Sequence, residues 1–465
     1  MTIVKRFIII GLDCLAPQLI FEKFKDDLPF FGKLRKRAKF GTLESTIPAI
    51  TCPAWNCMMT SSDPGMMGVY GFRNRSGYGY DELAIANSSY VNKPLLWDVL
   101  AKKGLSSVLL NVPQTYPPKP IKGYKVCAFL TPGIESDFTY PVELKQELLK
   151  AVPDYMIDVA GFRTDNKEWL LKEIYKMSKA RFKATDFLLK TKPWDFFMVV
   201  FMGPDRLHHG FWKYFDPVHP LYTPGHLFQN VMRKYYMFLD RQIEQTLKPY
   251  LDENTGIMFV SDHGAQAMQG GFFLNEWLIK EGYLILKQKP AKSCKLTTDM
   301  IDWKRTKAWG AGGYYGRIFL NVKGREPSGL IKQNEVNSVL QELKTKLESL
   351  NDDDAKPMGN RAFFPHDIYR EVNRIPPDII LYLGNLTWRS QGTIGSGELY
   401  THENDTGPDD ANHAQNGFYL LYHPSIKEPR YEHQRIYDIA PTICDALGME
   451  KQDSFIGTSF WNVDK

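Results

Sequence analysis

The 465-residue sequence lacks the features that mark several specialised protein classes. Its six cysteines are scattered, without zinc-ribbon or disulfide-framework spacing, so we expect reduced and mostly buried thiols. Basic tracts are missing and the net charge is only +5, so no nucleic-acid-binding surface is indicated. The apolar run FIIIG near the N-terminus is too short to cross a membrane and ends beside an aspartate, which favours a buried strand. We therefore expect a cytoplasmic protein without a membrane segment, and its oligomeric state stays open.

Hydrophobic periodicity predicts an α/β fold. Hydrophobic residues make up 43% and charged residues 24% of the chain, as in ordinary globular proteins. Several apolar runs are hydrophobic throughout, as in strands covered on both faces, and helical patterns separate them. This alternation predicts a doubly wound, mainly parallel sheet. The strand-like runs are 7–11, 107–112, 195–201, 256–261, 317–322, 378–383 and 418–422.

We expect one catalytic domain over residues 1–465 with two additions to its core. Residues 130–190 contain a proline-rich connection and a long charged helical stretch, which could form a cap. Residues 305–385 follow a strand, helix, strand pattern and could form a small α+β subdomain.

Three of the apolar runs end in carboxylates, two of them with histidine nearby. Asp13 follows the first run, Asp205 and His209 follow the third, and Asp262 and His263 follow the fourth. In a parallel sheet the carboxyl ends of strands share one edge, and carboxylate with imidazole is a ligand set for zinc or manganese. Each residue alone could be a helix cap or a polar loop residue. Together they predict a metal centre.

Thr51 in the stretch ESTIPAITCPAWNCMM precedes a proline that suits the start of a helix. Its hydroxyl could simply cap that helix. Alternatively it is a nucleophile at a helix N-terminus, where an anion is stabilised. Cys52 is a rival nucleophile by residue type, ranked lower because buried thiols are common.

Several motifs carry a family resemblance across most of the chain. They are IIIGLD, STIPAITCPAWNCMMTSSDPGMMGVYGFRNR, FMGPDRLHHGFW, VSDHGAQAMQGGFFLNEWL, GRIFLNVKGREPSG and NHAQNGFYLLY. With them the sequence resembles the alkaline phosphatase superfamily, in its type I phosphodiesterase and nucleotide pyrophosphatase branch, and most closely prokaryotic members described as predicted phosphohydrolases or phosphomutases. The resemblance implies an alkaline-phosphatase-like core.

The resemblance also implies two divalent metal ions, Zn²⁺ or Mn²⁺, and a threonine nucleophile. One metal would be held by Asp13, Thr51, Asp262 and His263, and the other by Asp205, His209 and His413. His413 is assigned by the resemblance alone, since its segment DDANHAQNG otherwise indicates a plain loop.

Two departures bear on specificity. Nucleotide pyrophosphatases usually carry Asn and His shortly after the threonine, where this chain has Ala54 and Trp55. Sulfatases place a cysteine at the position of Thr51 and an arginine at that of Trp55, which argues against sulfatase chemistry. Candidates for contact with substrate phosphate are Asn56, Asn74, Arg75, Lys307, Arg317 and Arg325.

The sequence thus predicts a metal-dependent phosphohydrolase, a phosphodiesterase or pyrophosphatase acting on a small phosphate ester. A phosphomutase or phosphotransferase with the same site is an alternative. A second alternative is a non-catalytic, metal-stabilised binding protein.

Overall fold

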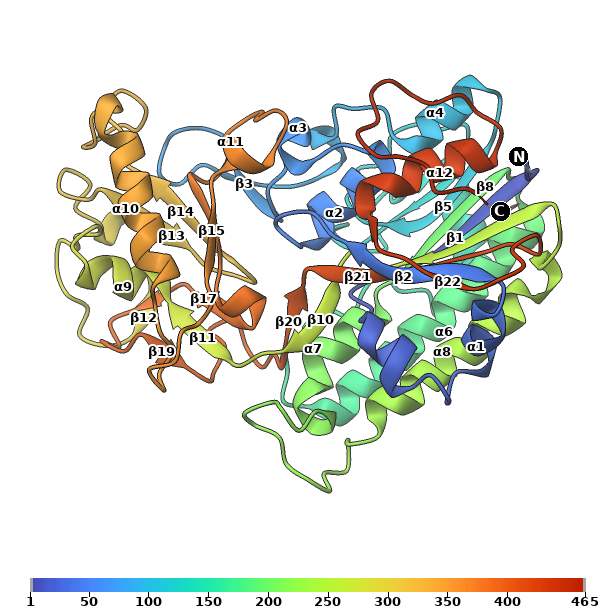
Figure 1. Cartoon of the computed structure of the whole chain (residues 1–465), viewed down its shortest axis with the longest axis horizontal. Helices are drawn as coiled ribbons and strands as arrows, with labels where there is room; N and C mark the ends of the chain where they lie inside the picture. The colour runs from blue at the N-terminus through green and yellow to red at the C-terminus, as the bar shows by residue number, and fades with distance from the viewer. Residues whose placement is uncertain (1–2, 463–465) are drawn as a thin grey trace.

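The computed structural model describes residues 3–462 and is built around a large central β-sheet (Figure 1). Strands β9, β1, β8, β5 and β6 run parallel, whereas β21, β2 and β7 add antiparallel pairings at the flanks. The mainly parallel α/β prediction is therefore confirmed. The strand order is β22 (Arg430–Tyr431), β2 (Ala38–Glu44), β21 (Asn416–Tyr422), β9 (Thr255–Val260), β1 (Arg6–Leu12), β8 (Phe196–Phe201), β5 (Ser107–Val112), β6 (Gly123–Cys127) and β7 (Thr139–Tyr140), and β23 (Gln434–Arg435) also pairs with β2.

Helices cover both faces of this sheet. In Figure 1 one layer lies below it: α1 (Pro29–Arg35), α6 (Lys167–Thr191), α7 (Gly203–Phe215) and α8 (Val231–Leu247). The other layer lies above it: α2 (Thr51–Thr60), α4 (Leu96–Lys102) and α12 (Ile439–Ala446). Ile8 and Ile10 of β1 pack in the core of the first layer, and Phe7 and Ile9 in that of the second. Because side chains alternate along a strand, a strand buried on both faces must be apolar throughout.

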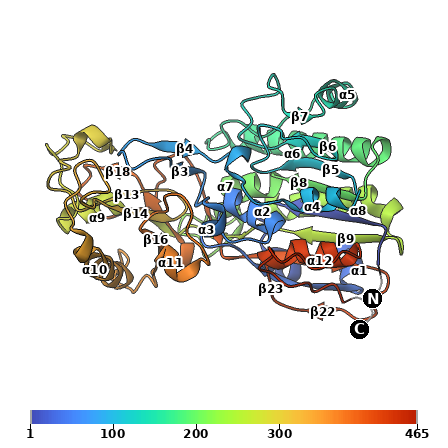
Figure 2. The same cartoon turned by 90° about the horizontal axis from the view of Figure 1, so that it is seen from above.

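A smaller unit lies beside the large sheet (Figure 2). Residues 305–385 supply the four strands of its antiparallel sheet. The strand order is β13 (Ala308–Ala311), β14 (Gly316–Leu320), β16 (Ile379–Tyr382) and β15 (Arg361–Phe363). Helices α9 (Leu274–Lys280) and α10 (Val336–Glu348) pack on it, and Trp277, Leu343 and Ile379 share its separate hydrophobic core.

The segment 130–190 was expected to form a cap, and for its long helix this is wrong. Leu170, Ile174 and Leu188 of α6 are fully buried in the core beneath the large sheet. Most of the charged residues that suggested a separate element lie on the outer face of an amphipathic helix, whereas Lys167 and Arg181 are buried. Before α6, the short helix α5 (Leu144–Ala151) follows the edge strand β7.

Short strand pairs lie near the carboxyl ends of the central strands. Strand β10 (Gly264–Ala267) pairs with β20 (Ala411–Ala414), and β11 (Gly270–Phe273) pairs with β17 (Trp388–Gln391) and β19 (Tyr400–Thr401). The N-terminal apolar run is the central strand β1, and no helix within residues 3–462 is long and apolar enough to cross a membrane. All six cysteines are free, and all but Cys294 are buried.

Candidate metal centre

Two strands deliver the first group of candidate ligands. β1 and β9 pair in parallel with Gly11 opposite Val260, so Asp13 and the Asp262–His263 pair emerge side by side at one edge. Asp13 Oδ1 and Asp262 Oδ2 are buried and make no well-formed hydrogen bond among the described residues. His263 Nε2 lies 3.1 Å from Asp262 Oδ2. These unsatisfied acceptors fit a cation, because leaving them buried without one is costly.

The second group is assembled by a helix and a distant strand. α7 follows β8, and its first turns place His209 Nε2 3.2 Å from Asp205 Oδ1. His413 lies on β20 opposite Ala265 of β10, so the pairing of these strands carries it to the same edge. The rings of His263 and His413 stack with centroids 3.7 Å apart, which makes the two groups immediate neighbours.

Thr51 lies beside both groups. Helix α2 begins at Thr51 with Ile50 as its N-cap residue, and no side chain makes a capping hydrogen bond there. The Thr51 hydroxyl lies 3.3 Å from His263 Nε2 instead. The alternative that Thr51 only caps the helix is therefore wrong. Its oxygen lies at the positive end of the helix dipole and against the candidate ligands.

Each of the three histidines has its Nδ1 atom occupied by an acceptor. His413 Nδ1 is 2.9 Å from Ala49 O, His263 Nδ1 is 3.2 Å from Gly264 O, and His209 Nδ1 is 2.7 Å from Asp409 Oδ1. In the neutral ring, an acceptor at Nδ1 keeps the proton on that atom and leaves the Nε2 lone pair facing the cluster. Ligating histidines in metalloproteins are held in this way.

Among the acceptors at the histidine Nδ1 atoms, Asp409 also binds two arginines. Besides His209, its buried carboxylate accepts from Arg163 Nε at 3.0 Å and from Arg389 Nη1. Burial would raise the pKa of Asp409, but the charges of His209, Arg389 and Arg163 lower it well below its usual value. Arg163 also donates to the hydroxyl of Tyr314 at 2.6 Å, and the Tyr314 ring stacks on His413 at 3.9 Å between centroids. These contacts thus hold two candidate ligands, His209 and His413, in place.

The charges of the cluster favour cations. Burial, followed by the negative charges of Asp262 and Asp205, raises the pKa of Asp13 well above its usual value. Burial alone would lower the pKa of His263, but Asp262, Asp13 and Asp205 raise it to about 9. Buried carboxylates that repel one another and raise neighbouring pKa values are stabilised by a divalent ion. The two groups are therefore candidate sites for divalent metals, with the carboxylate and imidazole donors that such metals take.

Comparison with known proteins assigns the family. The model of the family described as type I phosphodiesterase/nucleotide pyrophosphatase matches residues 7–409. The chain belongs to this family. It is accordingly a hydrolase acting on phosphate esters. No curated protein sequence matches the chain.

Solved structures show the same fold. Human ectonucleotide pyrophosphatase/phosphodiesterase 5 is 14% identical with a TM-score of 0.56, over 99% of this chain and 98% of that one. The murine enzyme, in an inactive threonine-to-alanine variant in complex with AMP, is 13% identical with a TM-score of 0.56, over 99% of both chains. The type I phosphodiesterase family and the alkaline-phosphatase-like architecture are thus confirmed.

The amides proposed to contact substrate have local partners. Asn56 donates from Nδ2 to Cys52 O at 2.9 Å within α2. Asn74 accepts from Tyr70 N at 2.7 Å and donates to Gly71 O at 3.0 Å, which closes a turn. Neither contact is to the metal-ligand candidates, so substrate binding by these side chains stays a prediction.

The cations proposed for the same role belong mostly to the smaller unit and its border. Arg75 forms a buried ion pair with Glu326 at 3.0 Å, and Arg325 pairs with Asp378 at 2.7 Å. Arg317 donates to a backbone carbonyl of residue 73 at 2.7 Å, and Lys307 is exposed. The contacts of the three arginines account for their side chains structurally and give no support to a role in substrate binding.

Sequence reasoning missed Cys14 and the role of Trp55. Trp55 is fully buried and donates from Nε1 to Asp13 Oδ2 at 2.8 Å. Cys14 Sγ lies within 4.8 Å of ligand atoms of Asp205, His209 and His413. Burial and the charge of Asp205 raise the pKa of its thiol. Cys14 could have been predicted to lie in the cluster because it directly follows Asp13. No sequence pattern predicts that the indole of Trp55 contacts Asp13.

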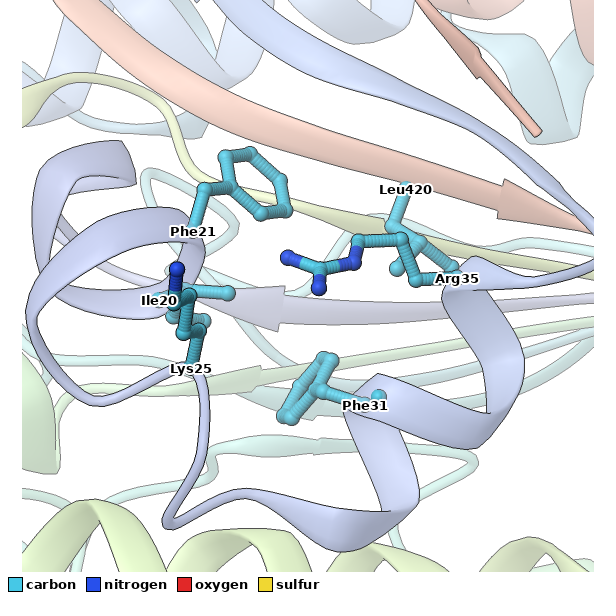
Figure 3. Close-up of a pocket in the computed structure, with 7 residues that line it drawn as sticks. Ile20, Phe21, Lys25, Phe31, Arg35 and Leu420 are labelled. Atoms are coloured by element: carbon cyan, nitrogen blue, oxygen red, sulfur yellow. The ribbon is translucent and has the colours of Figure 1, made fainter.

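Other features are separate from the cluster. Cys52 is buried among apolar side chains such as Met67 and Val69, and burial raises its pKa, as expected for a structural thiol. A small hollow between α1 and the π-helical turn η1 (Leu19–Lys23) is lined by Phe21, Phe31 and side chains around them (Figure 3). It contains none of the candidate ligands.

Proposed function

We propose that the protein is a two-metal phosphodiesterase with Thr51 as its nucleophile. The observation that carries this proposal is the Thr51 hydroxyl at the start of α2, 3.3 Å from His263 Nε2, where both groups of ligands converge. The inactive threonine-to-alanine variant of the murine relative, seen in complex with AMP, supports the assignment. Asp13, Thr51, Asp262 and His263 would hold one ion, and Asp205, His209 and His413 the other.

Two divalent cations, Zn²⁺ or Mn²⁺, would draw charge from the phosphate oxygens and ease deprotonation of the threonine when bound. The Thr51 oxygen attacks phosphorus in line, so that a Thr–O–P bond forms as the P–O bond to the leaving alcohol breaks. Backbone N–H groups at the start of α2 would stabilise the negative charge of the phosphoryl oxygens. Water then attacks the phosphothreonine, which releases a phosphate monoester and restores the hydroxyl.

The test is turnover of a bis-nitrophenyl phosphate diester and of the matching monoester by protein loaded with zinc or manganese. We expect diester hydrolysis that falls at least ~10³-fold in Thr51→Ala. Cys52→Ala, which changes the adjacent residue, should retain it. Acid quenching during turnover should reveal phosphate on Thr51 by mass spectrometry. Wild-type turnover in Thr51→Ala, or loss in Cys52→Ala alone, would overturn the assignment.

A further inference from the structure

Cys14 lies in the second group of ligand atoms. Its Sγ and one ligand atom each from Asp205, His209 and His413 all lie within 4.8 Å of one another, and the four residues are buried. A sulfur and a nitrogen or oxygen atom bound to the same zinc ion are separated by at most about 4.4 Å, the sum of a Zn–S and a Zn–N or Zn–O bond length. The spacing of the four groups is thus close to that of a common coordination shell.

The Nε2 atom of His209, in the same group, gives an independent indication of a bound cation. His209 Nε2 is buried and makes no well-formed hydrogen bond among the residues described, its polar neighbour being Asp205 Oδ1 at 3.2 Å, and its ring is fixed at Nδ1 by Asp409. A fully buried nitrogen in this state fits a ligand that accepts its lone pair. The Cys14 thiol has weak partners, Gly264 O at 3.5 Å from Sγ and the Asp205 carboxylate.

The backbone of Cys14 has a conformation that favours glycine, so the cysteine side chain is kept there at a cost. Its φ is +62°, in the left-handed region, where a residue other than glycine costs on the order of 1 kcal/mol or more. Glycine would relieve this cost. A cysteine here carries strain and places a sulfur beside two imidazoles and a carboxylate.

We propose that Cys14 is a fourth protein ligand to the ion held by Asp205, His209 and His413. The inference rests on the two-metal function proposed above. On binding, the thiol loses its proton to solvent and the sulfur donates an electron pair to the cation. Sulfur with imidazole favours zinc over manganese, so this position is a zinc site. Four protein ligands would still leave a position for a substrate oxygen, because a catalytic zinc ion can take a fifth ligand.

The test is cobalt substitution, because a thiolate on Co²⁺ gives a near-ultraviolet charge-transfer band that oxygen and nitrogen ligands do not give. Cobalt-loaded wild type should show the band. Cys14→Ser and Cys14→Gly should lose it while still binding cobalt. Cys52→Ser is the matched control, since it removes another buried thiol outside both ligand groups, and it should keep the band. Cys14→Gly also suits the left-handed backbone, so a folded variant is expected from that substitution.

A second readout is metal preference. The ratio of zinc to manganese affinity at this position should fall roughly tenfold or more in Cys14→Ser. Bound cobalt without the band in wild type would overturn the assignment of Cys14. Failure to bind cobalt would overturn both this inference and the metal centre. A cysteine-dependent band in a protein without diester turnover would uphold the Cys14 ligand and refute the proposed function instead.

Discussion

The indole of Trp55 is predicted to set how tightly the first group of ligands binds metal. Its Nε1 donates to Asp13 Oδ2 at 2.8 Å, which leaves Asp13 Oδ1 free within the cluster. Trp55→Phe keeps an aromatic ring in the fully buried site but removes the donor. Asp13 then loses the hydrogen bond that fixes its orientation.

The magnitude follows from the nature of this bond. A hydrogen bond to a charged group contributes about 1.5–3 kcal/mol. At 1.4 kcal/mol per factor of ten, that loss corresponds to about 10–100-fold weaker metal binding, the usual effect of removing an outer residue that holds a metal ligand. The effect should be confined to the ion of Asp13, Asp262 and His263, because Trp55 makes no hydrogen bond to the second group among the described residues.

Calorimetric titration of the chelator-treated protein with zinc or manganese resolves the two binding events. Trp212→Phe is the matched control, since Trp212 is also buried and its Nε1 donates at 2.8 Å to Asp216, which lies outside the cluster. We expect one weakened event in Trp55→Phe and none in Trp212→Phe. Equal weakening of both events, or wild-type affinity, would refute the reasoning.

Three further predictions follow from the same geometry. Asp409→Asn should weaken binding of the ion at His209 by about 10–100-fold and leave binding of the other ion unchanged in the same titration; wild-type affinity for both ions would contradict this prediction. His263 has a pKa raised to about 9, so its protonated form stabilises the metal-free protein below its ordinary pKa of 6.5, and that stability is lost as pH rises through about 9. Metal must displace this proton, so affinity at that position should rise about tenfold per pH unit between pH 7 and 9, and a flat profile would exclude it. Arg75→Met should lower the free energy of unfolding by about 1.5–3 kcal/mol in urea titrations, because buried Glu326 loses one of its two arginine partners and keeps Arg325 at 3.0 Å; a raised KM at unchanged stability would instead restore Arg75 as a substrate contact.

The sequence by itself determined the class of fold and most of the chemistry. Strands buried on both faces must be apolar throughout, so β1, β8 and β9 can be recognised from their uninterrupted runs of hydrophobic residues. Parallel strands end at a common edge, so Asp13, Asp205 and Asp262 could be expected to converge without knowledge of the strand order.

Only the tertiary structure decided how the cluster is completed. His413 reaches it through the pairing of β20 with β10, a contact between segments far apart in the chain that local pattern does not encode. The same holds for Trp55 and Asp409, whose roles depend on where a buried donor or acceptor points in space. The long helix α6 was misjudged for a related reason: amphipathicity shows that one face is covered, and tertiary packing alone decides which surface covers it.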